Sequence, residues 1–367
     1  MAYIIVGMSG GVDSSVAAYL LIQQGHQVEG LFMKNWDEED GSCTAEQDIS
    51  DAQSVCNKLN IPLHKINFAA EYWENVFEHF LQEYKNARTP NPDILCNSEI
   101  KFKYFVDYAK KLGADYIATG HYAGIVENNN KFDLIKGQDA TKDQSYFLYK
   151  LNQQQLQSAL FPLANIEKSE IRSIAKDLGL LNHDKKDSTG ICFISPGKFR
   201  DFLQSYIPCK PGKILTPDGI EIGIHNGVMY YTIGQRHGLG IGGQKNFGDE
   251  PWFIVEKDAK TNILTVVQGT AHELLYHNAL EANNFHWINP DHKKNGEFSC
   301  QAKIRYRQTD QQCQVVINEE SCRAYFDEPQ RAVSPGQSIV FYQNDICLGG
   351  AIITKALNSR ESNNNEQ

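Results

Sequence analysis

The sequence predicts an α/β protein in which a parallel sheet flanked by helices is followed by a small β-rich region and a C-terminal β-barrel. Three observations support this prediction. Buried-strand patterns alternate with amphipathic-helix patterns over about the first 200 residues. Beyond about residue 202, short strand patterns follow one another between Asp-Gly and Asn-containing turns. From about residue 282, strands and turns alternate again, which is typical of a small barrel.

The first region contains strand patterns at residues 3–8, 27–35, 63–69 and 115–123. Helical periodicity marks the segments that follow or separate them, at residues 13–25, 44–60, 70–87 and 98–113. Crossover helices of this kind pair the strands in parallel and cover both faces of the sheet. We therefore predict a Rossmann-like parallel sheet in this region.

The changes in pattern along the chain predict three domains and a tail. The first domain carries the α/β pattern, the second is small and β-rich, and the third is the barrel. Their expected bounds are residues 1–201, 202–281 and 282–356, and the polar tail at residues 357–367 is expected to be disordered.

The composition, with 41% hydrophobic and 22% charged residues, is that of a soluble globular protein. No apolar run approaches the ~20 residues that span a bilayer, and no basic segment precedes the first apolar one, so we expect a cytoplasmic protein without a membrane partner. The net charge of −10 argues against nucleic acid as a partner unless a local basic face exists. The nine cysteines form no CxxC pair, which counts against a zinc site or an iron–sulfur cluster.

A Gly-rich loop joins the first strand to the first helix, with the sequence GMSGGVDSS at residues 7–15. Glycines let the backbone approach a ligand closely, and a helix start offers amide groups and a positive dipole end to phosphate. The loop lacks the lysine with which a P-loop reaches the β- and γ-phosphates. An ordinary strand-to-helix turn is the alternative, but we predict a nucleotide site. Its expected residues are Gly7, Met8, Ser9, Gly10, Gly11, Val12, Asp13 and Ser14.

Two of the nine cysteines stand in settings that favour reactivity. Cys96 follows a Pro-marked loop and precedes a helix that we expect to begin near Asn97, and a helix start lowers the pKa of a thiol. Cys192 lies in a polar, turn-rich segment close to Lys185 and Lys186. Five others fall in helical or strand patterns, where a free cysteine is usually a small buried apolar residue; they are Cys56, Cys300, Cys313, Cys322 and Cys347. Cys43 and Cys209 lie in expected loops and show no sign of a partner.

Seven motifs in this order resemble the bacterial tRNA-specific 2-thiouridylase family, which belongs to the PP-loop ATP pyrophosphatases. They are GMSGGVDSS, NPDILCN, ATGHYA, KDQSYFLY, DSTGICFI, GQRHGLGIGG and RYRQ. The resemblance runs from residue 3 to about residue 354. Only the first motif is generic, and no motif position departs from the family pattern.

The resemblance implies a mechanism in two stages. In the first stage, ATP adenylates the 2-oxygen of the wobble uridine of a tRNA, and Met33 and Gly120 would also contact ATP; core packing at the end of a strand is the alternative for Met33. Because Asp13 is an acid beside a phosphate site, we also expect it to help hold Mg²⁺. Asp13 could equally be a first-turn acid favoured by the helix dipole. A persulfide on Cys192, supplied by a cysteine desulfurase or a relay protein, then provides the sulfur. Cys96 would form a transient disulfide with Cys192 or assist more directly.

The resemblance also implies the residues that bind the tRNA, with acceptors expected to be those for Lys, Glu and Gln. The target base would lie at Asn91, Pro92 and Asp93, and Asp93 is a plausible acid or base, with helix capping as its alternative. Lysine and arginine suit phosphate, and aromatic rings suit stacking. The alternative for His121 is a hydrogen-bonded residue at a strand end, and the alternative for each of the others is a solvated surface role. The remaining expected contacts are His121, Lys142, Asp143, Gln144, Arg305, Tyr306 and Gln337.

Two other function classes are compatible with parts of the sequence. The loop type also occurs in amidating and NAD-synthesising ligases, but a glutamine-fed ligase usually needs an amide-hydrolysing domain. One form of that domain exposes cysteine as its first residue, whereas Ala2 follows Met1 here. A non-enzymatic RNA-binding protein would fit the barrel alone. The intact loop and the two thiols argue against it.

Overall fold

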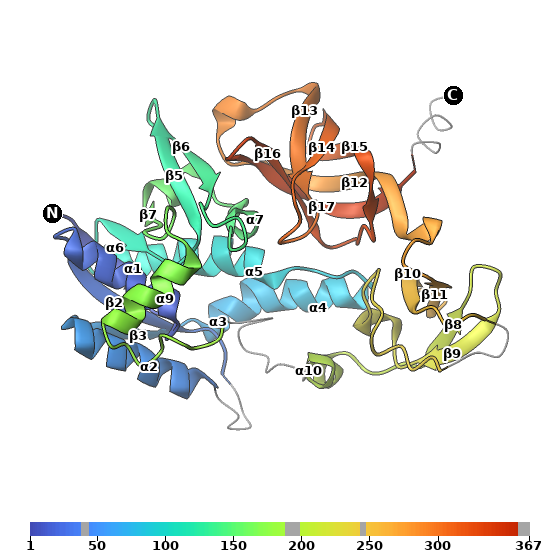
Figure 1. The fold of residues 1–367 in the computed structure, drawn as a ribbon, viewed down its shortest axis with the longest axis horizontal. Helices are drawn as coiled ribbons and strands as arrows, with labels where there is room; N and C mark the ends of the chain where they lie inside the picture. Colours follow the sequence, from blue (N-terminus) through green and yellow to red (C-terminus); the bar gives the residue numbers. More distant parts are fainter. Residues whose placement is uncertain (38–43, 188–198, 243–246, 359–367) are drawn as a thin grey trace.

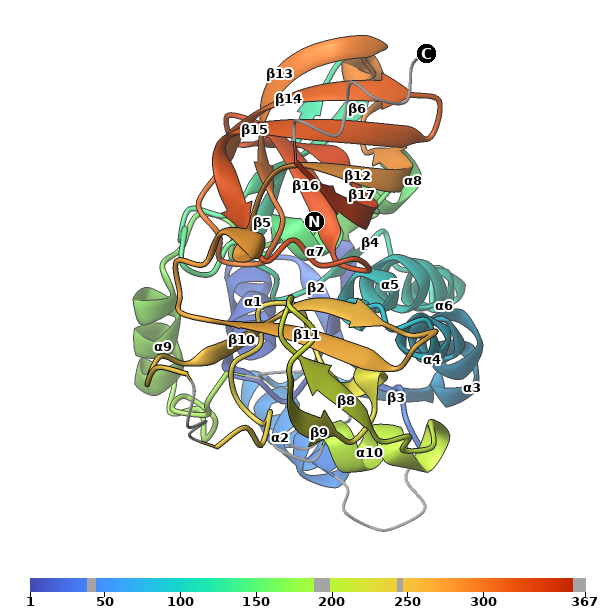
Figure 2. The ribbon, with the colours of Figure 1, turned by 90° about the vertical axis from the view of Figure 1, so that its right-hand side faces the viewer.

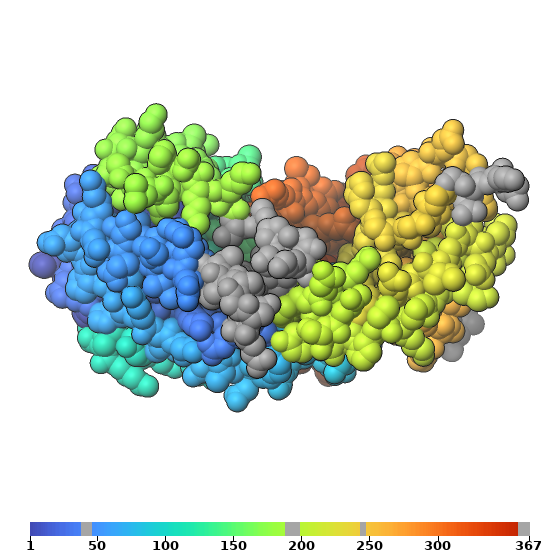
Figure 3. All heavy atoms as spheres, turned by 90° about the horizontal axis from the view of Figure 1, so that it is seen from below, coloured from blue at the N-terminus to red at the C-terminus, as the bar shows by residue number. Residues whose placement is uncertain are grey.

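The computed structural model describes residues 1–37, 44–187, 199–242 and 247–358. An α/β part, a small β-rich part and a barrel follow one another along the chain (Figure 1). The barrel lies above the other two parts in both side views (Figures 1 and 2), and from below it is visible between them (Figure 3). Among the described helices, none has the length and apolarity needed to cross a membrane.

The α/β part contains the predicted parallel sheet, with the strand order β3-β2-β1-β4-β7. The strands are β1 (Tyr3–Gly7), β2 (Gln27–Lys34), β3 (Leu63–Asn67), β4 (Tyr116–Ala118) and β7 (Ala159–Leu160). All four pairings between neighbours are parallel. The short strand β7 was not predicted, since two residues carry no recognisable pattern.

Strand β1 is buried on both faces of this sheet. Ile4 and Val6 pack on one face with helices α1 (Val12–Gln23), α2 (Thr44–Leu59) and α9 (Lys168–Asp177). Ile5 packs on the other face with two longer helical stretches, residues 69–85 and 92–111. Double burial explains why the strand is a continuous apolar run instead of an alternating one.

Each of these longer stretches contains a π-helical segment. The first consists of α3 (Ala69–Tyr72), π-helical η1 (Trp73–Phe77) and α4 (Glu78–Lys85), and the second of α5 (Pro92–Leu95), π-helical η2 (Cys96–Tyr104) and α6 (Phe105–Lys111). The second stretch begins at Pro92, not near Asn97 as predicted. Asn91 caps it, because its Oδ1 accepts the Asp93 amide at 3.1 Å, and proline is favoured at the first helical position.

The small β-rich part is a four-stranded sheet with the order β10-β11-β8-β9. Its strands are β8 (Gly212–Leu215), β9 (Glu221–His225), β10 (Trp252–Asp258) and β11 (Ile263–Gln268). Helix α10 (Phe199–Tyr206) precedes it, and 3₁₀ turns lie at η3 (Val228–Tyr230) and η4 (Glu273–Leu275). The pairing of β11 with β8 is parallel, whereas the other two are antiparallel.

The C-terminal part is an antiparallel barrel that is closed by the pairing of β12 with β17. Its six strands are β12 (Tyr276–Trp287), β13 (Gly296–Lys303), β14 (Gln311–Asn318), β15 (Ser321–Arg331), β16 (Ser338–Gln343) and β17 (Ile346–Leu357), with η5 (Pro290–His292) between the first two. Closure removes the unpaired edges that an open sheet would leave. The predicted fold class is confirmed.

A hairpin from the α/β part extends the sheet of this barrel. Strands β5 (Ala123–Asn128) and β6 (Lys131–Lys136) form the hairpin, and Ile135 and Leu134 of β6 pair with Ile346 and Cys347 of β17. Helices α7 (Ser145–Leu148) and α8 (Gln153–Gln157) follow it. The sequence did not predict this connection, because nothing in the pattern of a hairpin shows which distant strand edge it pairs with.

Thr89 is the point at which all three parts of the molecule meet. Its amide donates to Pro335 O at 3.0 Å and its carbonyl accepts Gln337 Nε2 at 2.6 Å, both in the barrel. Its hydroxyl lies 3.4 Å from Thr232 Oγ1 and 3.5 Å from Lys257 Nζ, both in the small β-rich part. The residues that follow Thr89 are therefore held against both β domains.

Gly336 provides a test of this junction, because an added Cβ would lie 2.8 Å from the Thr89 amide nitrogen and its φ is +93°. We expect Gly336→Ala to lower the melting temperature measured by calorimetry. Left-handed alanine costs about 1–2 kcal/mol, and displacing the loop adds about 1–3 kcal/mol. The matched control is Gly296→Ala, since Gly296 also has positive φ (+75°) but an added Cβ meets nothing within 4 Å. Equal losses in the two variants would contradict the role of the junction.

Candidate active site

The Gly-rich loop leads from the carboxyl end of β1 into an uncapped helix. The N-cap of α1 is Gly11, and no side chain caps the first turn, so its amides remain available to a ligand. Ser14 Oγ lies 3.2 Å from the Ser9 amide and donates to Gly11 O at 3.1 Å, so this hydroxyl holds the loop in shape. Gly10 has φ of +73°, and a Cβ there would lie 2.5 Å from Asp48 O. The open amides fit phosphate oxygens.

The other predicted nucleotide residues lie around this loop. A Cβ on Gly7 would be 3.6 Å from Met33 Cε, and a Cβ on Gly120 would be 2.7 Å from the Ser14 amide nitrogen. The side chains of Met8 and Val12 are buried, so they can meet a ligand only through their backbone. The residues share the carboxyl edge of the sheet, where ligands of α/β proteins bind. Their contact with ATP stays a prediction.

An ionic network that the sequence analysis missed lies directly beside the loop. Lys168 Nζ is 2.7 and 2.8 Å from the two Asp13 carboxylate oxygens and 2.9 Å from Asp187 Oδ1. Tyr122 donates its hydroxyl to Asp13 at 2.7 Å. Asp13, which we expected to help hold Mg²⁺, is thus already engaged with a cation. In the described ranges, no three His, Cys, Asp or Glu side chains cluster as metal ligands do.

Asp187 forms ion pairs with three cationic side chains. Lys142 Nζ lies 2.7 Å away and Arg172 Nη2 lies 3.1 Å away, in addition to Lys168. Although burial opposes its charged form, hydrogen bonds from Lys142 and Lys168 lower the pKa of Asp187 to about 2. This carboxylate is therefore ionised at any physiological pH.

The segment before Asp187 is fastened to the Gly-rich loop. Asn182 Nδ2 donates to Gly10 O and to Ser15 Oγ, both at 3.0 Å. Lys185 Nζ bonds the carboxylates of Asp48 and Asp51 at 2.7 and 2.6 Å. The hydrogen bonds of Asn182 and the ion pairs of Lys185 thus connect residues 182–187 to the loop and to α2.

Cys192 and its predicted pairing with Cys96 lie outside the described residues. Asp187, in the ionic network, is the last described residue before Cys192, and Phe199 is the first described residue after it. The Phe199 ring lies 5.7 Å from the ring of Tyr84. Both flanks of the Cys192 segment therefore rest on the α/β part.

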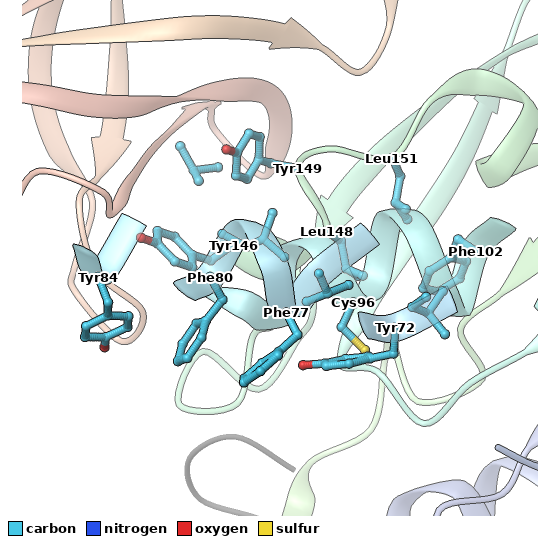
Figure 4. Close-up of a cluster of buried hydrophobic side chains, with 14 of the residues drawn as sticks. Tyr72, Phe77, Phe80, Tyr84, Cys96, Phe102, Tyr146, Leu148, Tyr149 and Leu151 are labelled. Carbon is cyan, nitrogen blue, oxygen red and sulfur yellow. The ribbon is translucent and has the colours of Figure 1, made fainter. Parts of the chain in front are cut away.

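Cys96 is buried in the core of the α/β part. Its side chain is 4% exposed, and its sulfur points toward Tyr72 (Figure 4). Burial raises the pKa of Cys96 to about 11. The prediction of a lowered pKa is therefore wrong for this structure, because the helix starts five residues earlier than expected and the thiol lies away from its N-terminus.

Lys101 is a cation whose charge acts on the thiol of Cys96, and no sequence pattern predicted this role. Its positive charge favours the thiolate of Cys96 and the carboxylate of Asp93, against the effect of burial, which raises the pKa of both. In an α-helix, residues five apart face different directions. In the π-helical segment η2, i→i+5 bonding places Lys101 one turn above Cys96. No pattern in the sequence predicted this geometry.

His121 lies at the same site as a neutral side chain. Its ring packs between Phe102 and Phe161, with centroids 5.9 and 6.0 Å away, and its Nδ1 lies 2.8 Å from Thr119 Oγ1. Burial, and then the charge of Lys101, lower its pKa well below the ordinary value. Its predicted contact with tRNA would therefore be made by an uncharged imidazole.

The predicted tRNA residues fall into groups at the junctions between domains. Gln337 bonds Thr89, two residues before Asn91, so it lies close to the predicted base site. Tyr306 donates to Lys142 O at 3.4 Å, and its ring centroid is 4.5 Å from that of Phe147. The barrel therefore brings one predicted contact to each of two loops of the α/β part.

Three further predicted tRNA residues use their side chains within the protein. The buried Asp143 carboxylate accepts bonds from Ser145 and from Lys303 Nζ at 3.2 Å. Gln144 Oε1 accepts the Tyr122 amide at 3.0 Å. Arg305 donates to Ala332 O. Contact of these residues with tRNA stays a prediction, and for Asp143 it would have to be indirect.

The fold and the loop together define a class of protein. A parallel sheet whose central strand leads through a Gly-rich loop into an uncapped helix is an α/β domain of the kind that can bind nucleotides, and here it is joined to two β-rich domains. The matching family models are the tRNA methyl transferase HUP domain at residues 2–196, the tRNA methyl transferase PRC-barrel domain at residues 200–268 and the aminomethyltransferase beta-barrel domain at residues 277–353.

Curated relatives match nearly the whole chain. A protein of Pseudomonas aeruginosa named tRNA-specific 2-thiouridylase MnmA is 58% identical over 355 residues, which cover 96% of this chain and 94% of the relative. The protein of the same name from Salmonella arizonae is 58% identical over 358 residues, which cover 96% of this chain and 97% of the relative. The one from Methylococcus capsulatus is 55% identical over 361 residues, which cover 97% of this chain and 97% of the relative. The chain belongs to the MnmA family of tRNA-specific 2-thiouridylases.

The chemistry of Cys96 can be tested by thiol labelling at different pH values. We expect its labelling rate, followed by peptide mass spectrometry, to rise through a midpoint near pH 11. The Lys101→Gln variant should move this midpoint upward, because it removes a charge that favours the thiolate. The control is Lys103→Gln, whose exposed lysine pairs with Glu99. A midpoint of about 8.5, that of an exposed thiol, or equal midpoints in the two variants, would contradict this account.

Proposed function

We propose that the protein is an ATP-dependent tRNA sulfurtransferase that converts the wobble uridine to 2-thiouridine. One observation carries the proposal: the relatives named 2-thiouridylase match at 55–58% identity over all three parts of the chain. A ligase that shared only the loop would not require the β-rich domains. The proposed domains are residues 1–201, 202–281 and 282–356, and the proposed location is the cytoplasm.

In the proposed first stage, the uridine 2-oxygen attacks the α-phosphorus of ATP bound at residues 7–14. An oxygen–phosphorus bond forms, the bond to the β-phosphate breaks, and pyrophosphate leaves. The uncapped amides of α1 support this role, since they suit phosphate oxygens. If Mg²⁺ takes part, Asp13 in the first turn of α1 would be its protein carboxylate, and the phosphates would supply most of the other ligands.

In the proposed second stage, sulfur replaces the adenylated oxygen. The terminal sulfur of a Cys192 persulfide forms a bond to carbon 2 of the base, and AMP leaves with the oxygen. Attack of the Cys96 thiolate on Cys192 then breaks the persulfide bond and leaves a Cys96–Cys192 disulfide, which a cellular dithiol reduces. Alternatively, Cys96 attacks first and releases sulfide, which adds to the base.

The surroundings of Cys96 support its participation in either route. A thiol with a pKa of about 11 needs a base and a stabilising cation. Burial raises the pKa of Asp93, which makes this carboxyl a better proton acceptor than an exposed one. Lys101 lies near both groups. We therefore assign proton transfer to Asp93 and stabilisation of the thiolate to Lys101.

The proposed partners are a tRNA with a wobble uridine, of the Lys, Glu or Gln acceptors, and a cysteine desulfurase or relay protein. Asn91 to Asp93 would receive the target base, which must leave the anticodon stack to be modified. The position of Thr89 supports this, because the base site then lies where the α/β part meets both β domains. Each of the three domains could contact a different part of the RNA.

The test is a reaction with ATP, unmodified tRNA and a persulfide donor, analysed by mass spectrometry. We expect AMP and 2-thiouridine in equal amounts. Cys192→Ser should lower persulfide-dependent turnover by about 100-fold or more, because it removes the sulfur carrier. Cys209→Ser is the control, since Cys209 is exposed. Failure to thiolate any tRNA, or equal loss in both variants, would contradict the proposal.

A further inference from the structure

We propose that Lys168 is the phosphate-binding cation that the Gly-rich loop itself lacks. This inference rests on the proposed use of ATP, and it assigns Lys168 to the pyrophosphate portion of the nucleotide. Lys168 is the first residue of α9, far along the chain from the loop. No motif in the sequence pointed to it.

The placement of Lys168 is the first argument. Its side chain is 10% exposed, and its Nζ lies 2.7 Å from Asp13, the second residue of α1. The ammonium group is therefore hydrogen-bonded to a residue of the first turn of α1, whose backbone amides have no side-chain cap. Its backbone is also fixed, because the Lys168 amide donates to Asp139 Oδ2 at 3.0 Å.

The charge of Asp13 is the second argument. A carboxylate in the first turn of α1 would repel the phosphates that the loop is suited to bind. Lys168 offsets that charge, and Tyr122 shares it through a hydrogen bond at 2.7 Å. Burial, and then the charge of Asp13, raise the pKa of Tyr122, so this hydroxyl stays protonated and donates. Without Lys168, the negative charge of Asp13 would weaken the binding of phosphate at the loop.

The hydrogen-bond capacity of Lys168 is the third argument. An ammonium group has three donors. Two of them go to the two oxygens of Asp13, at 2.7 and 2.8 Å, and the third goes to Asp187. One bond is enough to hold the pair with Asp13, so the other donor can turn to a phosphate oxygen while both ion pairs persist. The lysine is thus positioned to bind phosphate without losing its carboxylate partners.

Equilibrium binding of ATP, pyrophosphate and AMP, measured by calorimetry, tests the assignment without relying on turnover. We expect Lys168→Gln to weaken the binding of ATP and pyrophosphate by about 10-fold or more and to leave the affinity for AMP unchanged. Lys168→Arg, which keeps the charge, should restore much of the loss. Lys176→Gln on the exposed side of α9 is the matched control and should change nothing.

The outcomes separate this inference from the proposed function. Equal weakening of all three ligands, or the same result in both glutamine variants, would overturn the phosphate role of Lys168 while ATP use stands. Failure of the unaltered protein to bind ATP would contradict the proposed function itself. If Lys168→Gln does not fold, the ¹⁵N signal of the Lys168 ammonium in the unaltered protein serves instead: a shift with pyrophosphate but not AMP supports the assignment, and no shift overturns it.

Discussion

The candidate site depends on the burial of strand β1 on both of its faces. Ile4, Ile5 and Val6 are fully buried between two layers of helices, which fixes β1 at the centre of the sheet. Its carboxyl end therefore opens between β2 and β4. Met33 at the end of β2 and Gly120 after β4 are brought to the same loop as a direct result. The geometry of the proposed nucleotide site follows from the packing of the sheet.

The helical stretch at residues 92–111 connects that loop to the proposed sulfur chemistry. Phe105 in its last part contacts Gly7, with Cε1 3.2 Å from the position of a Cβ, and Phe102 packs on His121. Its π-helical part places Lys101 over Cys96, and Thr89 just before it joins both β domains. One continuous element thus contacts the Gly-rich loop, carries the buried thiol and begins just after the domain junction.

The sequence predicted those features that depend on local pattern. The four longer strands of the parallel sheet, the Gly-rich loop and the barrel were predicted, because periodicity and turn residues report burial directly. Three features were not predictable in this way. The β6–β17 pairing joins residues about 200 positions apart, Lys168 reaches Asp13 from a helix with no motif, and the lowered pKa expected for Cys96 gave way to burial. All three depend on contacts between distant segments.

The central claim is that ATP is cleaved between its α- and β-phosphates to make the uridine oxygen a leaving group. The most direct measurement uses tRNA labelled with ¹⁸O at carbon 2 of the wobble uridine, followed by mass spectrometry of the products. We predict one ¹⁸O atom in AMP for each 2-thiouridine formed. Recovery of the label in orthophosphate together with ADP, or in water, would contradict this account.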